Sequence, residues 1–419
     1  MAKKLAPQQR TKKNAEDQVT HLPEIGPVGN VQFAGYASVY PRKKQPKHPA
    51  KEEAIFYWFA GAENYEKKPT ILWSNGGPGC SSLWGFFIEN GPYCFKENQH
   101  GKFELKPNPH SWSRHANYLI FEHPLGVTLS FHEDTNTLPQ NVGAGIEQLY
   151  QAFQHFVAKH PEIADNPIIL AGESYAGTYL PLLAKAIIEG NQSKDNIPLH
   201  LETMVLLDSW VNPMVQMETD TTYALNHGMI TAAQKQELDE KYNHNLPQIN
   251  QAIQQICGLY MTNIAQIADP PFQPILDYIN RADVRKAIHV KHDTPVKESW
   301  SAAIGNLYAF GVNDSYASTV QELLGRGLQT IVISGLNDAK DCNFLGTGAW
   351  LSLLEGEAAR KFKDAKTRQW KGSPSQGVLG YIQDGGKLSW VKVLNAGHMA
   401  ARDQPLLINL IKEMSHAWR

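Results

Sequence analysis

Short apolar runs alternate with longer amphipathic segments along most of this 419-residue chain. Between residues 142 and 159, apolar side chains recur every three or four positions, which predicts a helix with one buried face. Brief apolar runs predict buried strands at 70–74, 117–122, 167–171, 204–207, 330–334 and 390–394. Further helices are expected from the turn after residue 171 to about 188, and near 316–324, 349–357 and 405–414.

This alternation predicts an α/β fold with a mostly parallel central sheet covered by helices on both faces. Two aromatic runs, 31–40 and 54–60, come earlier and are expected to form an antiparallel hairpin around the basic stretch 41–51. We interpret that stretch as a solvated turn, since charge runs usually face water. From about 213 to 300 the chain is polar and helical, which predicts an insertion that caps one edge of the sheet.

Composition narrows the class of protein. The chain is 42% hydrophobic and carries 39 Lys and Arg against 41 Asp and Glu, so it has enough apolar surface for a large core but no basic excess for nucleic acid. No apolar run reaches the roughly 18 residues of a membrane span.

Residues 1–20 read as a flexible basic tail before a single domain at 21–419. The tail has no apolar h-region, which leaves a cytoplasmic protein or export without a cleaved signal. A secreted or acidic location would follow if a signal had been removed. A homodimer is a further expectation.

The four cysteines are few for this length and form no C-x-x-C pair, so we do not expect a structural zinc site. No other metal or organic cofactor is expected for the chemistry described below. One or two disulfides fit the count, and the pairing of Cys80, Cys94 and Cys257 is left open.

The strongest chemical signal is Gly172-Glu-Ser-Tyr-Ala-Gly177, a G-x-S-x-G pattern placed between a predicted strand and a predicted helix. That context is typical of a nucleophile elbow, in which a tight turn exposes the serine at a helix N-terminus. A serine hydroxyl needs a base and an orienting acid, which follow it in the order Asp, His in α/β-hydrolases. Ser174 is therefore the candidate nucleophile.

Two later strands lead into loops that carry the acid and the base. Asp338 follows the strand at 330–334, and His398 follows the strand at 390–394 in a Gly-containing loop. Asp341 and Asp403 are rival acids. Asp341 lies further past the strand end, and Asp403 is expected to open the last helix.

An oxyanion hole needs two backbone N–H donors. One is expected from Tyr175, after the nucleophile, and the other from the Gly-rich loop 75–79. A tight turn or a phosphate cradle are the alternatives for that loop. A phosphate loop would end in Lys and Ser or Thr, whereas Cys80-Ser-Ser82 follows here without the Lys.

Several blocks of the sequence resemble the signature blocks of the serine carboxypeptidases. They are Trp73-Ser-Asn-Gly-Gly-Pro-Gly-Cys-Ser-Ser82, Gly172–Gly177, and Gly397-His-Met399 with Asp403-Gln-Pro405. Shorter matches at 21–23, 108–112, 126–131 and 342–346 extend the resemblance over about residues 21–415. The resemblance implies an α/β-hydrolase fold and the release of single residues from the C-termini of peptides or proteins.

The same resemblance implies a role for each matching residue. It makes Ser174, Asp338 and His398 the catalytic triad. It makes the N–H groups of Gly77 and Tyr175 the oxyanion donors.

It also implies that the substrate's terminal carboxylate is held by Asn75, the Gly76 N–H, Glu89 and Glu173, with Trp73 in the same hydrogen-bonded framework. Two glutamates would repel a carboxylate unless protons are shared. We therefore expect peptidase activity to fall as pH rises toward neutral, and substrates without a free carboxylate to suffer less. For Glu89, the alternative is a solvated helix residue.

Departures from the family pattern leave two questions. Gly335-Leu-Asn-Asp338 has one residue more before Cys342 than relatives have, so counting back from Cys342 leads to Ala339 and leaves Asp341 as the rival acid. Asp208-Ser-Trp210 and Ala400-Ala401 replace Gly-Asn-Gly and Val-Pro, changes that we expect to alter the pocket walls.

The same comparison gives expectations for two of the cysteines. Cys80 has no family partner near Trp300, and Cys342 is expected close to the triad, where a mercurial would inhibit. Two other functions stay open: an esterase or acyltransferase using the same triad, and a protective binding partner whose catalysis is incidental.

Overall fold

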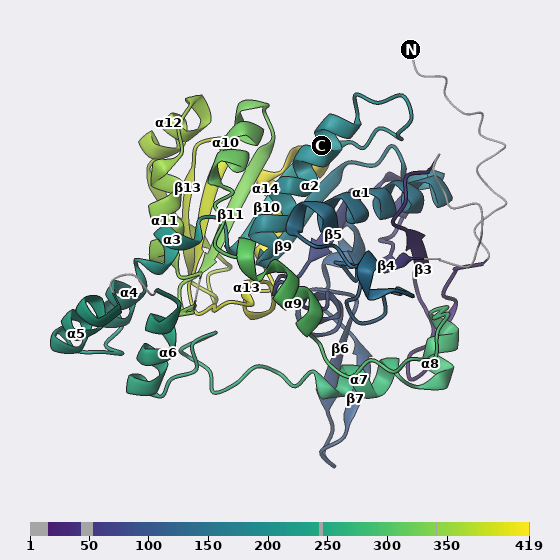
Figure 1. The fold of residues 1–419 in the computed structure, drawn as a ribbon, viewed down its shortest axis with the longest axis horizontal. Helices are drawn as coiled ribbons and strands as arrows, with labels where there is room; N and C mark the ends of the chain where they lie inside the picture. The colour runs from purple at the N-terminus through teal and green to yellow at the C-terminus, as the bar shows by residue number, and fades with distance from the viewer. Residues whose placement is uncertain (1–15, 43–52, 243–245, 341, 419) are drawn as a thin grey trace.

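The computed structural model describes residues 16–42, 53–242, 246–340 and 342–418. Its centre is a ten-stranded sheet in the order β12-β13-β14-β11-β10-β9-β5-β8-β4-β3 (Figure 1). The strands are β3 (Gln32–Ser38), β4 (Ala54–Ala60), β5 (Thr70–Ser74), β8 (Asn117–Phe121), β9 (Ile168–Ser174), β10 (Leu201–Ser209), β11 (Gln329–Gly335), β12 (Thr367–Lys371), β13 (Val378–Asp384) and β14 (Leu388–Val393).

The run of strands from β14 to β8 is parallel, and antiparallel strands flank it on both sides. The predicted mostly parallel sheet is confirmed. β3 and β4 pair antiparallel, as predicted for the early hairpin. Its basic loop falls almost entirely within 43–52, outside the described residues.

Side chains from the sheet enter two apolar cores, one on each face. In β9, Ile168 and Leu170 join the first core, while Ile169 and Ala171 join the second. Because both faces are covered, the strand reads as a continuous apolar run. This explains why the middle strands were visible in the sequence.

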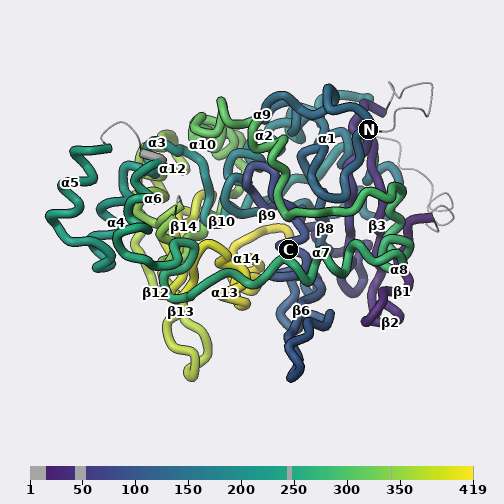
Figure 2. The backbone as a smooth tube through the Cα atoms, turned by 60° about the horizontal axis from the view of Figure 1, so that its bottom comes forward, coloured from purple at the N-terminus to yellow at the C-terminus, as the bar shows by residue number. Residues whose placement is uncertain are grey.

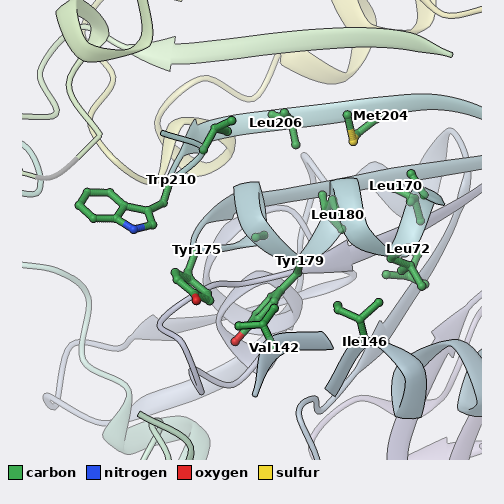
Figure 3. Close-up of a cluster of buried hydrophobic side chains, with 14 of the residues drawn as sticks. Leu72, Val142, Ile146, Leu170, Tyr175, Tyr179, Leu180, Met204, Leu206 and Trp210 are labelled. Atoms are coloured by element: carbon green, nitrogen blue, oxygen red, sulfur yellow. The ribbon is translucent and has the colours of Figure 1, made fainter. Parts of the chain in front are cut away.

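Helices α1 (Val142–Lys159), α2 (Ala176–Gly190), α10 (Ala317–Gly325), α11 (Phe344–Leu353) and α12 (Glu357–Asp364) cover the first face. Helices α13 (Ala400–Asp403) and α14 (Leu407–Met414) cover the second, together with the short π-helix η3 (Gly85–Glu89) (Figure 2). The apolar face predicted at 142–159 is buried along its whole length. Figure 3 shows Val142 and Ile146 of α1 in the first core with Leu180 of α2.

Two details differ from the sequence expectation. The helix expected at 349–357 begins at Phe344, because Asn343 caps it by accepting from Gly346 N at 3.0 Å. It ends before an extended Leu354, and Gly356 at φ 95° separates it from α12. The edge strand β12 and its neighbour β13 were not predicted, and for β12 the reason is that most of it is exposed and carries no apolar pattern.

The predicted helical insertion is divided in two. Helices α3 (Pro213–Met217), α4 (Asp220–Asn226), α5 (Ala232–Tyr242) and α6 (Leu246–Cys257) gather beside α11 at one end of the molecule. Helices α7 (Gln273–Ile279) and α8 (Ala282–Ala287) lie toward the opposite end, near the small sheets β1–β2 (His21–Leu22, Gly26–Pro27) and β6–β7 (Tyr93–Glu97, Phe103–Pro107) (Figure 1). An extended segment joins the two groups, and α9 (Ala302–Tyr308) follows.

Residues 16–20, which we expected to belong to a flexible tail, pack against the domain, whereas residues 1–15 lie outside the described residues. Asp17 and Val19 are buried, and Asp17 O accepts from Ala34 N at 2.9 Å, which adds this segment to the edge of β3. Ion pairs from Asp17 to Lys159 and His160, at 2.9 and 3.0 Å, hold it against α1. None of the helices in the described part of the chain combines the length and the apolarity that a bilayer crossing requires.

Candidate active site

Ser174 stands at the end of β9, directly before α2, in a left-handed backbone conformation with φ 61°. Two glycines make this turn feasible. A Cβ on Gly172 would lie 2.3 Å from Ser74 O, and a Cβ on Gly177 would lie 2.8 Å from Ser209 Cβ. The G-x-S-x-G pattern is thus a packing requirement, and it presents Ser174 at the N-terminus of a helix.

His398 and Asp338 are hydrogen-bonded, with 2.7 Å between His398 Nδ1 and Asp338 Oδ2. Asp338 follows β11 and His398 follows β14, both of which run parallel to β9. Because the carboxyl ends of parallel strands share one edge, Ser174 and this pair gather there. Asp338 is fully buried, whereas the His398 side chain is 12% exposed, so the imidazole is accessible to a substrate.

The rival acids differ in their placement. Asp403 closes α13 instead of opening the last helix. Its Oδ2 accepts from Gly397 N and from Asn263 Nδ2, both at 2.9 Å, so its carboxylate supports the loop before His398. Asp341 lies outside the described residues. Asp338 is the carboxylate that the described structure places on His398.

The Gly-rich loop after β5 lies against Tyr175. A Cβ on Gly76 would lie 2.3 Å from Tyr175 N, so only glycine permits this approach. Gly77 has a φ of 114°, which also favours glycine. The loop therefore brings the backbone of Gly77 close to the amide of Tyr175, as an oxyanion hole requires.

The outer side of the same loop is bound to a distant segment. Trp300 Nε1 donates to Pro78 O at 2.7 Å, and Ser81 N donates to Ser299 O at 2.8 Å. Cys80 and Trp300 form an isolated β-bridge, and Cys80 takes part in no disulfide. In the sequence, the region around Trp300 was notable only because it lacks a cysteine that could pair with Cys80, and this contact was not predicted.

A buried carboxyl cluster adjoins Ser174. Asn75 Nδ2 donates to Glu89 Oε1 at 2.8 Å and to Glu173 Oε1 at 2.9 Å. Asn75 Oδ1 accepts from Trp73 Nε1 at 2.9 Å and from Gly85 N at 3.0 Å, so the orientation of the amide is determined from both ends. Glu89 is only 5% exposed, so the alternative of a solvated helix residue is wrong.

Both glutamates hold their protons more strongly than usual. Burial raises the pKa of Glu89, and the neighbouring Glu173 and Asn75 side chains and the charge of Arg402 oppose this rise. Burial also raises the pKa of Glu173 well above its usual value, and the charges of Glu89 and Asp208 raise it further. The two carboxyl groups accept from the same Asn75 amide, and the charge of Glu89 helps to raise the pKa of Glu173, which favours a proton on Glu173.

Asp208 has a position that the sequence did not indicate. Its side chain is buried, as are those of Ala400 and Ala401, and the expected effect of these residues on the pocket walls stays a prediction. Asp208 Oδ1 accepts from Gly335 N at 2.8 Å, which ties the end of β10 to the end of β11. Burial and the charge of Asp338 raise the pKa of Asp208 well above its usual value. A third buried carboxyl group with a raised pKa therefore lies beside the acid loop.

Cys342 lies beside the Asp338–His398 pair. Its Sγ, a carboxylate oxygen of Asp338 and a ring nitrogen of His398 all lie within 4.8 Å of one another. Among the described residues, this is the only group of three or more His, Cys, Asp or Glu arranged closely enough to hold a metal ion. The thiol is buried, as is the carboxylate.

Comparison with known proteins gives a consistent result. The family model for serine carboxypeptidases matches residues 23–269 and 259–415. Serine carboxypeptidase-like 47 of Arabidopsis thaliana is 28% identical over 402 residues, covering 89% of this chain and 76% of that protein. The pheromone-processing carboxypeptidase KEX1 of Phytophthora infestans is 26% identical over 430 residues, covering 93% of this chain and 70% of that protein.

A solved structure has the same fold. The crystal structure of a prohormone-processing carboxypeptidase from Saccharomyces cerevisiae, Kex1(delta)p, matches with a TM-score of 0.79. The match covers 96% of each chain at 19% sequence identity.

Proposed function

The chain belongs to the serine carboxypeptidase family, and from this premise we propose that it is a serine-type carboxypeptidase that acts through an acyl-enzyme on Ser174. His398 accepts the proton of the Ser174 hydroxyl as the oxygen attacks the scissile carbonyl carbon. Asp338 holds the imidazole by its bond to Nδ1 and stabilises the imidazolium that forms. The strained elbow at Ser174 supports this role.

The oxyanion is stabilised by the N–H groups of Gly77 and Tyr175. The C–N bond then breaks, and His398 gives its proton to the nitrogen of the C-terminal residue. That residue departs as a free amino acid. Water, deprotonated by His398, attacks the acyl-enzyme carbonyl carbon. The bond from that carbon to Ser174 Oγ then breaks, His398 returns the proton to Oγ, and the shortened peptide is released.

One observation carries the choice of a carboxypeptidase over a general esterase. Asn75, Glu89 and Glu173 form a buried hydrogen-bonded cluster, and Glu173 is adjacent to Ser174 in the chain. We assign to these groups, with the Gly76 N–H, the binding of the terminal carboxylate of a peptide whose scissile bond lies at Ser174. Trp73 orients the Asn75 amide for that contact.

Proton balance predicts the pH dependence. A bound substrate carboxylate adds a negative charge beside Glu89 and Glu173. The site can accept this charge only while the two glutamates are at least partly protonated, because ionised glutamates would repel the substrate. The raised pKa values of both groups favour that state in acid. Peptidase activity therefore falls as pH rises through neutral.

The test is the release of the C-terminal residue from an N-blocked dipeptide at about pH 5 and about pH 8, with an ester that lacks a free carboxylate as the companion substrate. Release favoured in acid and lost in Ser174→Ala supports the proposal. A peptide and an ester whose rates fall together over the same pH range contradict the carboxylate assignment. Peptide C-termini are the proposed substrates, and a homodimer and the compartment stay predictions.

A further inference from the structure

We propose that the segment 261–266, which lies between α6 and α7, is a positioning element that holds Asp338 and His398 in register, with Asn263 as its central positioning residue. The inference rests on the proposed function, because it concerns the same triad. The first group of insertion helices, α3 to α6, thereby gains a role in the catalytic centre, because the segment 261–266 directly follows them.

The segment pairs with the acid loop on one side. Ala339 N donates to Met261 O at 2.9 Å, and Ile264 N donates to Asn337 O at 3.1 Å. These two bonds flank Asp338, one from each neighbouring residue. They hold the backbone on which the buried carboxylate is mounted.

The same segment pairs with the histidine loop on its other side. His398 N donates to Thr262 O at 2.8 Å. Gly397 lies so close that a Cβ there would be 2.5 Å from Thr262 O and 2.4 Å from Asn263 Cβ. One short segment thus contacts both loops that carry the Asp–His pair, although they follow different strands.

Asn263 completes the connection through its side chain. It is buried, its Oδ1 accepts from Ala265 N at 3.0 Å, and its Nδ2 donates to Asp403 Oδ2 at 2.9 Å. The same Asp403 oxygen accepts from Gly397 N at 2.9 Å. Asn263 and the residue before His398 are therefore held by one carboxylate oxygen.

A second layer fixes that carboxylate. Gln266 Nε2 donates to Asp403 Oδ1 at 3.2 Å, and Arg402 Nη2 donates to Gln266 Oε1 at 2.6 Å. Arg402 also pairs with Asp403 Oδ1 at 3.0 Å. The positive charge of Arg402 therefore balances the negative charge of Asp403. As a result, Asp403 can accept the hydrogen bonds from Asn263 and Gly397 without leaving an uncompensated charge near His398.

The expected consequence is specific to the chemical step. Without the Asn263 amide, the histidine loop loses a support on the side of the acid loop, and the Asp338–His398 geometry relaxes. A misplacement of this kind lowers kcat by about 10- to 100-fold while leaving substrate binding nearly unchanged. A residue that merely supported the fold would instead lower the amount of active protein.

The experiment measures kcat and KM for an ester without a free carboxylate, so that Glu89 and Glu173 do not enter. Asn263→Ala removes the amide, Asn263→Asp keeps its size but replaces the donor, and Ile267→Ser alters a fully exposed neighbour as the matched control. End-point titration of Ser174 with an organophosphonate counts intact sites, so kcat is expressed per titrated site. The phosphonylation rate gives a second measure of nucleophile activation.

Both Asn263 variants are expected to lose kcat and phosphonylation rate by at least about tenfold, with KM within about twofold and Ile267→Ser unchanged. A kcat per site within about twofold of the wild type, or a loss found only in KM or in the number of titrated sites, would overturn the inference. If the wild type cleaves the ester but releases no C-terminal residue, the proposed function fails while this inference is still measured. A wild-type Ser174 that reacts with neither reagent overturns both.

Discussion

The carboxyl groups of Glu89 and Glu173 share one donor in a buried site, because each accepts a hydrogen bond from the amide of Asn75, at 2.8 and 2.9 Å. Replacing Glu173 by Gln makes one partner a permanent neutral donor. We expect the ratio of peptidase kcat/KM at about pH 8 to that at about pH 5 to rise at least about tenfold over the wild type.

The measurement is a pH profile of dipeptide and ester hydrolysis for both proteins. Ester hydrolysis by Glu173→Gln should keep its wild-type profile, because the ester brings no carboxylate. An unchanged peptidase ratio in this variant would show that the pair does not control the pH dependence.

The buried carboxyl group of Asp208 leads to a prediction about how stability depends on pH. Burial raises its pKa in the folded state, so the folded protein binds this proton more tightly than the unfolded chain does. Its contribution to the free energy of unfolding is therefore complete in acid and is lost as pH rises through the folded-state pKa. Asp208→Asn, which stays neutral, should raise the melting temperature by a few degrees at about pH 8 and change it little at about pH 4.

Melting curves at the two pH values test this directly, with Asp293→Asn, an exposed aspartate, as the control. A gain in melting temperature that is equal at both pH values would show that ionisation of Asp208 is not the cause.

Trp300 is expected to support the oxyanion loop, because its indole N–H donates to Pro78 O at 2.7 Å. Trp300→Phe keeps an aromatic ring but removes the donor. We expect kcat to fall by roughly 3- to 10-fold for ester and peptide alike, because one neutral hydrogen bond is worth about 1 kcal/mol. Phe310→Ala, which alters a fully exposed ring, should match the wild type in the same assay. A loss confined to peptide substrates would instead place Trp300 in substrate binding.

Cys342 is predicted to make the enzyme sensitive to mercurials, since mercury bound to its Sγ would occupy space beside Asp338 and His398. Most activity should be lost with an excess of p-mercuribenzoate, slowly because the Cys342 thiol is buried, and Cys342→Ser should resist. Cys94→Ser should stay sensitive, and Cys80 should react slowly because burial raises the pKa of its thiol to about 11. Full activity after modification of all thiols would contradict this prediction.

Asp338→Asn tests the choice of acid. Loss of the carboxylate from His398 Nδ1 should lower kcat by about three to four orders of magnitude, as the same change does in other triads. Asp341→Asn should stay within about twofold of the wild type in the same kcat assay. The reverse order of effects would reassign the acid to Asp341.

Much of the fold could be predicted because its signals are local. The helix at 142–159 has the periodicity of one buried face, and β5 is a short apolar run between polar segments. The edge strand β12 gives no such signal, since four of its five residues are exposed. The boundaries of α11 depend on the cap at Asn343 and on Gly356, which an apolar pattern does not include.

The chain's own pattern predicted the nucleophile elbow and the order of Ser174, Asp338 and His398, because each lies in a short block with a fixed local geometry. The residues proposed to bind the substrate carboxylate came from the resemblance to the serine carboxypeptidases. Tertiary structure alone decided the rest. It brought Asp338 into hydrogen-bond contact with His398, and Asp403 with the Gly397 amide before His398. It buried Asp208 against Gly335 and paired the segment 261–266 with the loops that carry Asp338 and His398. These contacts join residues far apart in the chain, and their energies depend on burial and on neighbouring charges that exist only once the sheet has brought the strand ends together.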